Sequence, residues 1–213
     1  MTTKIGIISD THSTSAPLKE AITLFHREGV DKIICAGDIA GYGEDELQET
    51  INILLENDCL RVCGNHDTEL SDEERGVMSI EVQEFLSSLP KKLELTLEDK
   101  KIYVAHASPP DKLHGGIKLL DQTGKVIPEN IKLWTEKLAS LKCDVLVVGH
   151  SHQVFAEKLG DILVLNPGST CFNHSCMILS LPDMRVKTFA LSGKEILRTW
   201  NWGMFYQNHP ENI

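Results

Sequence analysis

The sequence predicts an α/β fold in which two packed mixed β-sheets are flanked by helices. Over roughly the first two-thirds of the chain, short apolar runs alternate with segments of helical periodicity, a pattern typical of β-α-β units with parallel strands. The last third carries pairs of apolar runs separated by turn residues, and these favour antiparallel hairpins. Two sheets packed between helices would bury all of these runs.

The first half of the chain accounts for three parallel strands and two helices. The expected strands are short, rich in Ile or Val and bounded by polar residues. The first helix has apolar side chains at helical spacing and ends at Gly29, which suits a C-terminal cap. The expected strands are 4–10, 31–38 and 59–64, and the expected helices are 16–29 and 44–57.

The second half is expected to be richer in hairpins. Pro90 should stop one helix, and Pro128 lies near the start of another. The expected elements are helices 79–90 and 128–141, strand 143–150, and hairpins 92–107, 153–169 and 175–191, turning at 98–101, 160–161 and 182–183. We expect one domain, residues 1–213, with residues 198–213 as a C-terminal extension, because the sequence shows no repeat, low-complexity segment or linker.

Composition and charge exclude several classes of protein. The net charge of −10 argues against a nucleic-acid partner held by bulk electrostatics, although bound metal ions could still attract a small anionic substrate. No apolar run approaches the roughly 20 residues that span a bilayer, and the N-terminal apolar run ends too early for a secretory signal. We therefore expect a cytoplasmic protein with no membrane contact, whose six scattered cysteines are reduced core residues.

Polar side chains collect at the ends of five expected strands. In an α/β sheet, ligands bind outside the carboxyl ends of the strands, so these groups should converge: Asp10, His12, Asp38, Asn65, His106, His150 and His152. Their oxygen and nitrogen donors suit Mn, Fe, Co, Ni or Zn. One ion with an open position takes three or four protein ligands, so seven suffice for two ions if one carboxylate bridges them. Such pairs clamp an in-line displacement at phosphorus.

Six motifs in the chain resemble those of the calcineurin-like metallophosphoesterases. They are SDTHS at 9–13, GDIAGYG at 37–43, CGNHD at 63–67, AHASP at 105–109, GHSH at 149–152 and NPGS at 166–169. Their order is that of the family, and the last motif together with the GYG form of the second resembles its small bacterial and archaeal phosphodiesterase branch. The resemblance implies a four-layer αββα sandwich, in agreement with the fold expected from the apolar pattern.

Matched position by position, the resemblance also implies a two-metal site. One metal would be bound by Asp10, His12, Asp38 and His152, and the other by Asp38, Asn65, His106 and His150, with Asp38 bridging. His66 matches the catalytic histidine of the family, and Asp67 matches the acid beside it. We expect two divalent transition-metal ions, with Mn favoured over Fe, Ni, Co and Zn.

The chain departs from the family pattern at two places. Ala107 follows the fourth-motif histidine where the family often has Gly, so a Cβ there would narrow access to the backbone. After the second motif, residues 41–43 read Gly-Tyr-Gly where the protein phosphatases have Asp-Arg-Gly. The second departure argues against a protein serine/threonine phosphatase.

The expected activity is hydrolysis of phosphodiester bonds in a small molecule. A hydroxide shared by the two ions would attack phosphorus in line, while Asn65 and the metals hold the equatorial oxygens. A protonated His66 would stabilise charge and protonate the leaving group, and Asp67 would keep that imidazole charged and oriented. Asn65 and His66 are thus expected to bind substrate, and His114 and His174 are further candidates.

Several alternatives stay open. A non-enzymatic scaffold of the same fold, like the retromer subunit that resembles this family, would not need His66 or a full ligand set. A DNA-repair nuclease fits poorly with the acidic charge, whereas a phosphomonoesterase remains compatible. The aromatic tail, with Trp200, Trp202, Phe205 and Tyr206, either packs on its own domain or contacts another copy in a homo-oligomer.

Overall fold

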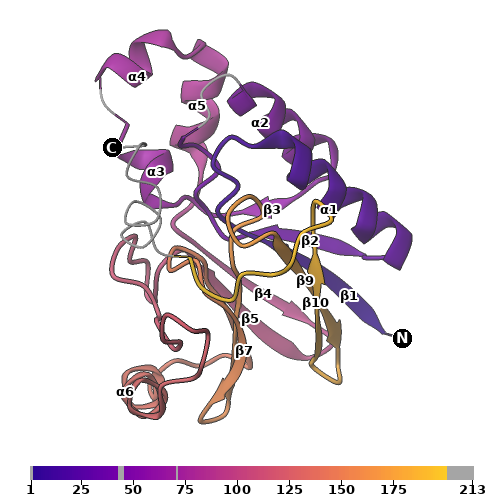
Figure 1. Cartoon of the computed structure of the whole chain (residues 1–213), viewed down its shortest axis with the longest axis vertical. Helices are drawn as coiled ribbons and strands as arrows, with labels where there is room; N and C mark the ends of the chain where they lie inside the picture. Colours follow the sequence, from indigo (N-terminus) through magenta and orange to yellow (C-terminus); the bar gives the residue numbers. More distant parts are fainter. Residues whose placement is uncertain (1, 43–45, 71, 201–213) are drawn as a thin grey trace.

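The computed structural model of the chain describes residues 2–42, 46–70 and 72–200, and for residues 72–74 the backbone alone. Within these ranges the strands form two five-stranded sheets that pack against each other, with helices on the outer faces (Figure 1). The helices are α1 Ser15–Glu28, α2 Leu47–Glu56, α3 Asn65–Thr68, α4 Asp72–Val77, α5 Ile80–Ser88 and α6 Pro128–Leu138. The expected fold class is confirmed.

The first sheet has the order β10-β9-β1-β2-β3. Its strands are β1 Thr3–Ile8, β2 Lys32–Cys35, β3 Leu60–Arg61, β9 Ser175–Leu181 and β10 Arg185–Ala190. β1, β2 and β3 are parallel, as expected for strands joined by α1 and α2, and the hairpin of β9 and β10 adds to the β1 edge in antiparallel fashion. The carboxyl ends of β1, β2 and β3 therefore open on the same edge.

The second sheet has the order β4-β5-β6-β8-β7. Its strands are β4 Lys92–Leu97, β5 Lys100–Ala105, β6 Val145–Val147, β7 Val154–Leu159 and β8 Ile162–Pro167. β5, β6 and β8 are parallel, and the hairpin partners β4 and β7 close the two edges in antiparallel fashion. Both sheets are thus mixed, as the sequence predicts.

The inner faces of the two sheets form one apolar core. Ile5, Ile7 and Ile34 of the first sheet belong to the same buried cluster as Val104 and Val147 of the second. All five side chains are fully buried, and burying a side chain of this size stabilises a fold by about 1.5–3 kcal/mol. The contact fixes the two sheets relative to each other, and with them the loops at their ends.

Helices cover the outer face of each sheet. The outer cluster of the first sheet contains buried residues of α1, α2 and α5, and Phe25 of α1 packs directly on Gly6 of β1, where a Cβ would lie 2.6 Å from the ring. The outer cluster of the second sheet contains Leu138 of α6 and the loop residues Ile117 and Leu119. Since each sheet is covered on both faces, the free strand ends are the places left for a site.

The predicted elements agree with the structure except around the third strand. β3 is only two residues long: Val62 still donates a hydrogen bond to the carbonyl of Cys35 in β2, but Cys63 donates to the carbonyl of Pro90 outside the sheet. The short helices α3 and α4 were not expected, since four and six residues are too few to show a helical period. All other expected hairpins and helices are present, and the first hairpin turns at Glu98 and Asp99.

The cysteines are free, as expected. Cys35, Cys59, Cys63 and Cys176 are buried, while Cys143 and Cys171 are half-buried. Burial raises the pKa of Cys59 and of Cys176 to about 12, so these thiols stay protonated and act as small apolar side chains.

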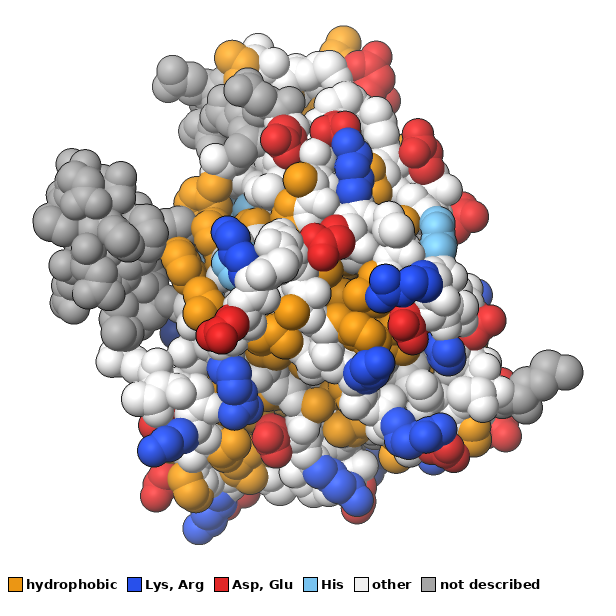
Figure 2. Space-filling view, turned by 45° about the vertical axis from the view of Figure 1, so that its right-hand side comes forward, with side chains coloured by type: hydrophobic (Ala, Val, Ile, Leu, Met, Phe, Trp, Pro, Cys, Tyr) orange, Lys and Arg blue, Asp and Glu red, His pale blue; other side chains and the backbone are white. Residues whose placement is uncertain are grey.

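Charge on the visible surface is mixed. Lys and Arg side chains alternate with Asp and Glu over the face shown in Figure 2. That face thus offers no continuous basic track for a nucleic-acid backbone. Among the described residues, no helix combines the length and apolar character needed to cross a membrane. Most of the predicted extension, residues 201–213, lies outside the described residues, and with it Trp202, Phe205 and Tyr206.

Candidate metal centre and active site

The candidate ligands meet between the carboxyl ends of strands from both sheets. Asp10 and His12 follow β1, Asp38 follows β2, and Asn65 opens α3 after β3. The second sheet contributes the residues that follow β5 and β6, namely His106, His150 and His152. The structure therefore brings together all seven residues that the sequence predicts as ligands, from loops up to 142 positions apart, the interval from Asp10 to His152.

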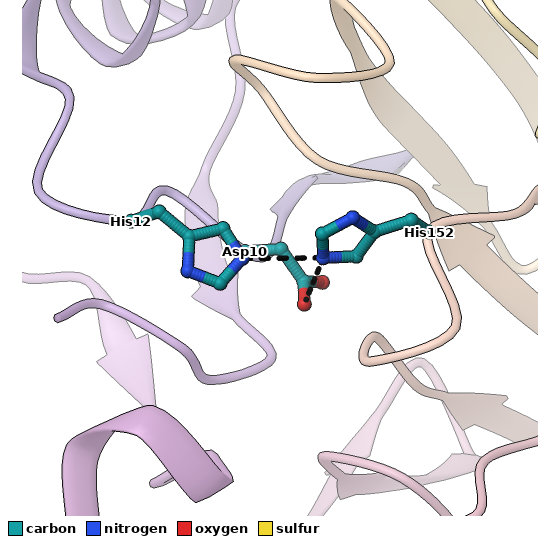
Figure 3. A group of neighbouring side chains, drawn as sticks. All are labelled: Asp10, His12 and His152. Carbon is teal, nitrogen blue, oxygen red and sulfur yellow. Dashed lines mark hydrogen bonds and ion pairs between the residues drawn. The ribbon is translucent and has the colours of Figure 1, made fainter. Parts of the chain in front are cut away.

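Asp10, His12 and His152 form the first cluster (Figure 3). Oδ1 of Asp10 lies 3.2 Å from Nε2 of His152, and Nε2 of His12 lies 3.1 Å from the same nitrogen. All three residues are buried. When two neutral imidazole nitrogens face each other, only one can donate, so at least one lone pair points into the shared space. That arrangement suits a cation.

Asp38, Asn65, His106 and His150 form the second cluster. Oδ2 of Asp38 lies 3.2 Å from Nε2 of His106, and Oδ1 of Asn65 lies 2.9 Å from Nδ1 of His150. Nδ1 of His106 is 2.7 Å from the carbonyl oxygen of Ala36, which can only accept, so Nδ1 carries the proton. In the neutral ring, Nε2 then carries the lone pair that can bind a metal.

Asp38 lies between the two clusters. Within the described part of the chain, candidate ligand atoms that lie within 4.8 Å of one another form three groups, and Asp38 belongs to two of them. The groups are Asp10–His12–His152, His12–Asp38–His66 and Asp38–His106–His150. One carboxylate thus reaches a histidine of each cluster, which is the position that a bridging ligand needs.

Tight backbone conformations aim these side chains. Five of the seven residues have positive φ angles, which non-glycine residues rarely adopt: Asp10 (53°), His12 (44°), Asp38 (52°), His150 (63°) and His152 (47°). Hydrogen bonds between the loops hold this backbone, such as those from the N–H groups of Asp10 and His12 to the carbonyls of Gly37 and Asp38, 2.9 and 3.1 Å long.

His150 and His152 show what these turns achieve. On a strand, two residues with this spacing would share one face of the sheet. Both lie beyond the end of β6, and they face different clusters. His150 contacts Asn65 of the second cluster, whereas His152 contacts Asp10 of the first.

Two glycines let the backbone approach the carboxylates. A Cβ on Gly64 would lie 2.0 Å from Oδ1 of Asp38, and one on Gly149 would lie 2.6 Å from Oδ2 of Asp10. Any side chain at either position would displace a candidate ligand. The glycines of the CGNHD and GHSH motifs are therefore required by close packing.

Burial and charge leave the first cluster ready to accept a cation. Burial lowers the pKa of His12 to about 4, against the opposing charges of Asp10 and Asp38, so at neutral pH the imidazole is uncharged. Burial alone would raise the pKa of Asp10, but the charge of His152 and a hydrogen bond to it outweigh burial and hold that pKa below its usual value. A neutral imidazole beside an ionised carboxylate is the form that binds metal.

The second cluster carries a proton instead. Burial disfavours the charged form of His106, yet the adjacent Asp38 carboxylate raises its pKa to about 9. The pKa of Asp38 is correspondingly lowered by His106, against the effect of burial. Burial, followed by the charge of His106, lowers the pKa of His150 to about 4. In the absence of metal, His106 thus supplies the positive charge in this cluster.

His66 lies between the ligands and the surface. Its backbone N–H donates to Oδ1 of Asp38 at 2.9 Å, and its ring makes an edge contact with His12, with centroids 5.1 Å apart. Nε2 of the ring is 3.4 Å from the hydroxyl of Tyr42. The half-buried ring is therefore anchored beside both clusters while one edge faces outward.

The carboxylate of Asp67 makes different contacts from the one expected. We expected its carboxylate to orient His66, but its oxygens accept hydrogen bonds from the backbone N–H groups of Ala40 and Gly64, 2.8 and 2.7 Å long. Burial, together with the charge of Asp38, raises the pKa of Asp67 to about 6. The side chain fastens the loop after β2 to the start of α3, and so acts on Asn65 and His66 through the backbone.

The two further substrate-binding candidates lie in different surroundings. Nε2 of the exposed His114 is 2.6 Å from Oε1 of Glu69, and its ring meets that of His150 edge-on, with centroids 6.0 Å apart. It therefore borders the second cluster. His174 accepts a backbone hydrogen bond from Leu191, and burial and nearby Lys194 lower its pKa. Its neighbour Phe172, by contrast, contacts the first cluster.

Residues that support the site were missed from the sequence. Ser169 donates to the carbonyl of Asp10 at 2.6 Å, and Asn166 donates to the carbonyl of Gly149 at 2.9 Å. Both belong to the NPGS motif, which had been noted only as a family feature. The rings of Tyr42 and Phe172 also lie against His12, with centroids 4.9 and 5.4 Å away. For Ser169 and Asn166, the available signal in the sequence was the polar NPGS motif at the end of a buried strand.

Comparisons with known proteins agree with this geometry. Residues 3–183 match the family model described as the calcineurin-like phosphoesterase superfamily domain. A phosphodiesterase from Methanocaldococcus jannaschii is 26% identical over 168 residues, which cover 79% of this chain and 84% of the relative. A probable metallophosphoesterase from the same organism is 30% identical over 185 residues, covering 84% and 76%.

Solved structures show the same architecture. The crystal structure of a metallophosphoesterase from Sphaerobacter thermophilus superposes with a TM-score of 0.64 at 20% sequence identity. The match covers 99% of this chain and 94% of that one. At this level of identity the likeness concerns the fold.

Proposed function

The chain belongs to the calcineurin-like phosphoesterase superfamily, a family of hydrolases acting on phosphoester bonds, and we propose that it hydrolyses phosphodiester bonds of a small molecule with the help of two divalent metal ions. A relative that shares 26% of its residues over most of both chains is named a phosphodiesterase, which supports the choice of ester. The donor set of nitrogen and oxygen atoms supports transition metals, and we favour Mn.

The position of Asp38 is the observation that carries the two-metal proposal. Its carboxylate lies in a group with His12 and in another with His106 and His150. The carboxylate is nearly fully buried, where an ionised group needs a positive partner. Two cations that share Asp38 would supply that charge to both clusters.

The bound ions would polarise the phosphoryl group and activate water for in-line attack. The residues of the chain complete the reaction. The Asn65 amide would hold a non-bridging oxygen of the phosphate as charge builds up on it. His66, on the outer side of the ligands, would give a proton to the departing alkoxide as the phosphorus–oxygen bond breaks. One water is consumed, and one alcohol and one phosphomonoester are formed.

A panel of substrates and metals tests the class of reaction. The purified protein is analysed for bound metal, and hydrolysis of bis-p-nitrophenyl phosphate is followed with Mn²⁺, Ni²⁺, Co²⁺ or Zn²⁺, beside the monoester p-nitrophenyl phosphate. We expect two equivalents of metal and turnover that favours the diester. Inactivity with every metal would contradict the enzyme and support a scaffold of the same fold.

His66 is tested by replacement with Ala. We expect the rate at saturating Mn²⁺ to fall roughly 10²–10⁴-fold, the usual contribution of a general acid, while two metals still bind. His26 is exposed on α1, so His26→Ala is the matched control and should keep the full rate. Unchanged turnover of the His66 variant would remove it from the mechanism.

A further inference from the structure

An aromatic wall borders the first cluster on its outer side. It consists of Tyr42, from the loop after β2, and Phe172, from the loop after β8. Their ring centroids are 5.8 Å apart, and the rings meet nearly at right angles. Neither residue is among the candidate metal ligands, yet both rings lie against one of them, His12.

Tyr42 touches the catalytic side of the site. Its ring centroid lies 5.0 Å from that of His66 and 4.9 Å from that of His12. The side chain is 60% exposed although it is large and aromatic. The preceding Gly41 has a φ of +112° and lies against both histidines, so the turn that carries Tyr42 is shaped by the site itself.

Phe172 is held in place from behind. Its ring stacks on His152 at an interplanar angle of 24° and on Trp200 at 17°. A ring fixed between two others presents a preorganised edge, and ordering it on binding costs little entropy. The backbone N–H of Trp200 donates to the carbonyl of His152, which fixes the stack relative to the first cluster.

We propose that Tyr42 and Phe172 form a stacking surface for a planar aromatic group on the leaving-group side of the substrate. The assignment to the leaving-group side rests on the proposed function, in which His66 protonates the leaving alkoxide. Because Tyr42 contacts His66, a ring attached to that alkoxide would reach Tyr42 first. The substrates are then diesters whose leaving alcohol carries a nucleobase or another aromatic ring.

Matched diesters with the same methyl group on one side test the surface. Methyl adenosine-5′-yl phosphate carries a base, methyl benzyl phosphate carries a simple aryl ring, and methyl tetrahydrofurfuryl phosphate has neither. We expect the two aromatic diesters to exceed the third by about tenfold in kcat/KM, within the range for one base stacked on an aromatic side chain. A gain for the adenosyl ester alone would restrict the surface to nucleobases.

Variants then assign the preference to the ring. Tyr42→Leu should remove the preference for aromatic diesters, whereas Tyr42→Phe should keep it, because the face of the ring and not its hydroxyl makes the contact. Leu55→Ser, an exposed apolar residue on α2, is the control. Equal kcat/KM values for the three diesters in the wild type, or an equal loss for all three in Tyr42→Leu, would overturn the inference.

Binding measurements separate this inference from the proposed function. By calorimetry, adenosine 5′-monophosphate should bind the Mn²⁺-loaded protein about tenfold more tightly than ribose 5-phosphate, and Tyr42→Leu should abolish the difference. If no diester is hydrolysed but this difference is found, the proposed function fails and the stacking surface stands. Equal or undetectable binding of both ligands overturns the surface.

Discussion

The two clusters of candidate ligands use similar kinds of side chain, yet the pKa values of His12 and His106 are shifted in opposite directions. In the first, His12 is a buried neutral imidazole beside the ionised Asp10. In the second, His106 pairs with Asp38, which raises its pKa to about 9. The pKa of a histidine is therefore lowered in the first cluster by burial, while in the second cluster one is raised by an adjacent carboxylate.

The residues that surround the two clusters also differ. Aromatic rings of Tyr42 and Phe172 border the first cluster, whereas the exposed pair of His114 and Glu69 borders the second. The difference teaches that the clusters need not load with metal in the same way. At neutral pH a metal that binds Nε2 of His106 must displace a proton, whereas a metal that binds His12 need not.

Removal of the Asp38 carboxylate, which the two clusters share, should impair metal binding in both of them. Asp38→Asn leaves both clusters without their common anion, so we expect metal content to fall below two equivalents and kcat/KM to fall at least about 10²–10³-fold. Metal analysis and diester hydrolysis measure both effects. Asp183→Asn, an exposed carboxylate in the β9–β10 turn, is the control. Retention of two metals and of the full rate by Asp38→Asn would show that the clusters are independent.

The pH dependence of stability should expose the opposite pKa shifts of these histidines in metal-free protein. The raised pKa of His106 contributes stability that is fully present below about pH 6.5 and is lost as the pH rises through about 9. The lowered pKa values of His12 and His150, both about 4, act in the other direction. Their contribution falls as the pH drops from 6.5 towards 4, because the unfolded chain then binds more protons.

Urea unfolding of the metal-free protein between pH 5 and 10 measures this curve, expected to peak near neutral pH (about 6.5). His106→Gln should flatten the alkaline side and weaken the acidic side only in part, because the charge of His106 is a smaller cause than burial of the lowered His150 pKa. A stability that still rises between pH 7 and 9 in the wild type would contradict the ion pair.

Replacement of Asp67 should distinguish a structural role of its side chain from a direct effect on catalysis. In Asp67→Asn, one of the two backbone N–H groups loses its acceptor, which costs about 1–3 kcal/mol for a buried donor. We expect a lower unfolding temperature and an unchanged pH dependence of kcat. A changed pH profile at full stability would instead support a direct effect on His66.

The smallest effect is expected at the rim of the second cluster. The ion pair between Glu69 and His114 is exposed, with side-chain exposures of 55% and 60%, and exposed pairs contribute about 0–1 kcal/mol. Glu69→Gln should leave the melting temperature and metal content unchanged, and alter KM by less than about threefold. A larger rise in KM would place His114 in contact with the substrate.

Much of this architecture could be predicted from the sequence. The fold class followed from the order of apolar runs, and the convergence of the seven ligands followed from their places at strand ends. These features depend on local patterns and on the geometry of parallel strands, which the chain specifies directly.

Other features depend on which loops meet in space. Asp67 bonds to the amide of Ala40, 27 positions away, and a single sequence holds no signal for that contact. The contact of Phe172 with His152 is of the same kind, since its loop reaches the site only because β8 lies beside β6. The homo-oligomer contact predicted for the tail stays a prediction, because most of the tail lies outside the described residues.

The positive φ angles of five ligands have an evolutionary consequence. A left-handed conformation costs a non-glycine residue roughly 1–2 kcal/mol, and glycine would avoid that cost at Asp10, His12, Asp38, His150 or His152. Selection of a mutant library for thermal stability alone should therefore enrich glycine at these codons, whereas selection for catalysis should remove it. With bis-p-nitrophenyl phosphate as the selected substrate, the codons at which the two selections disagree would map the active site before the natural substrate is known.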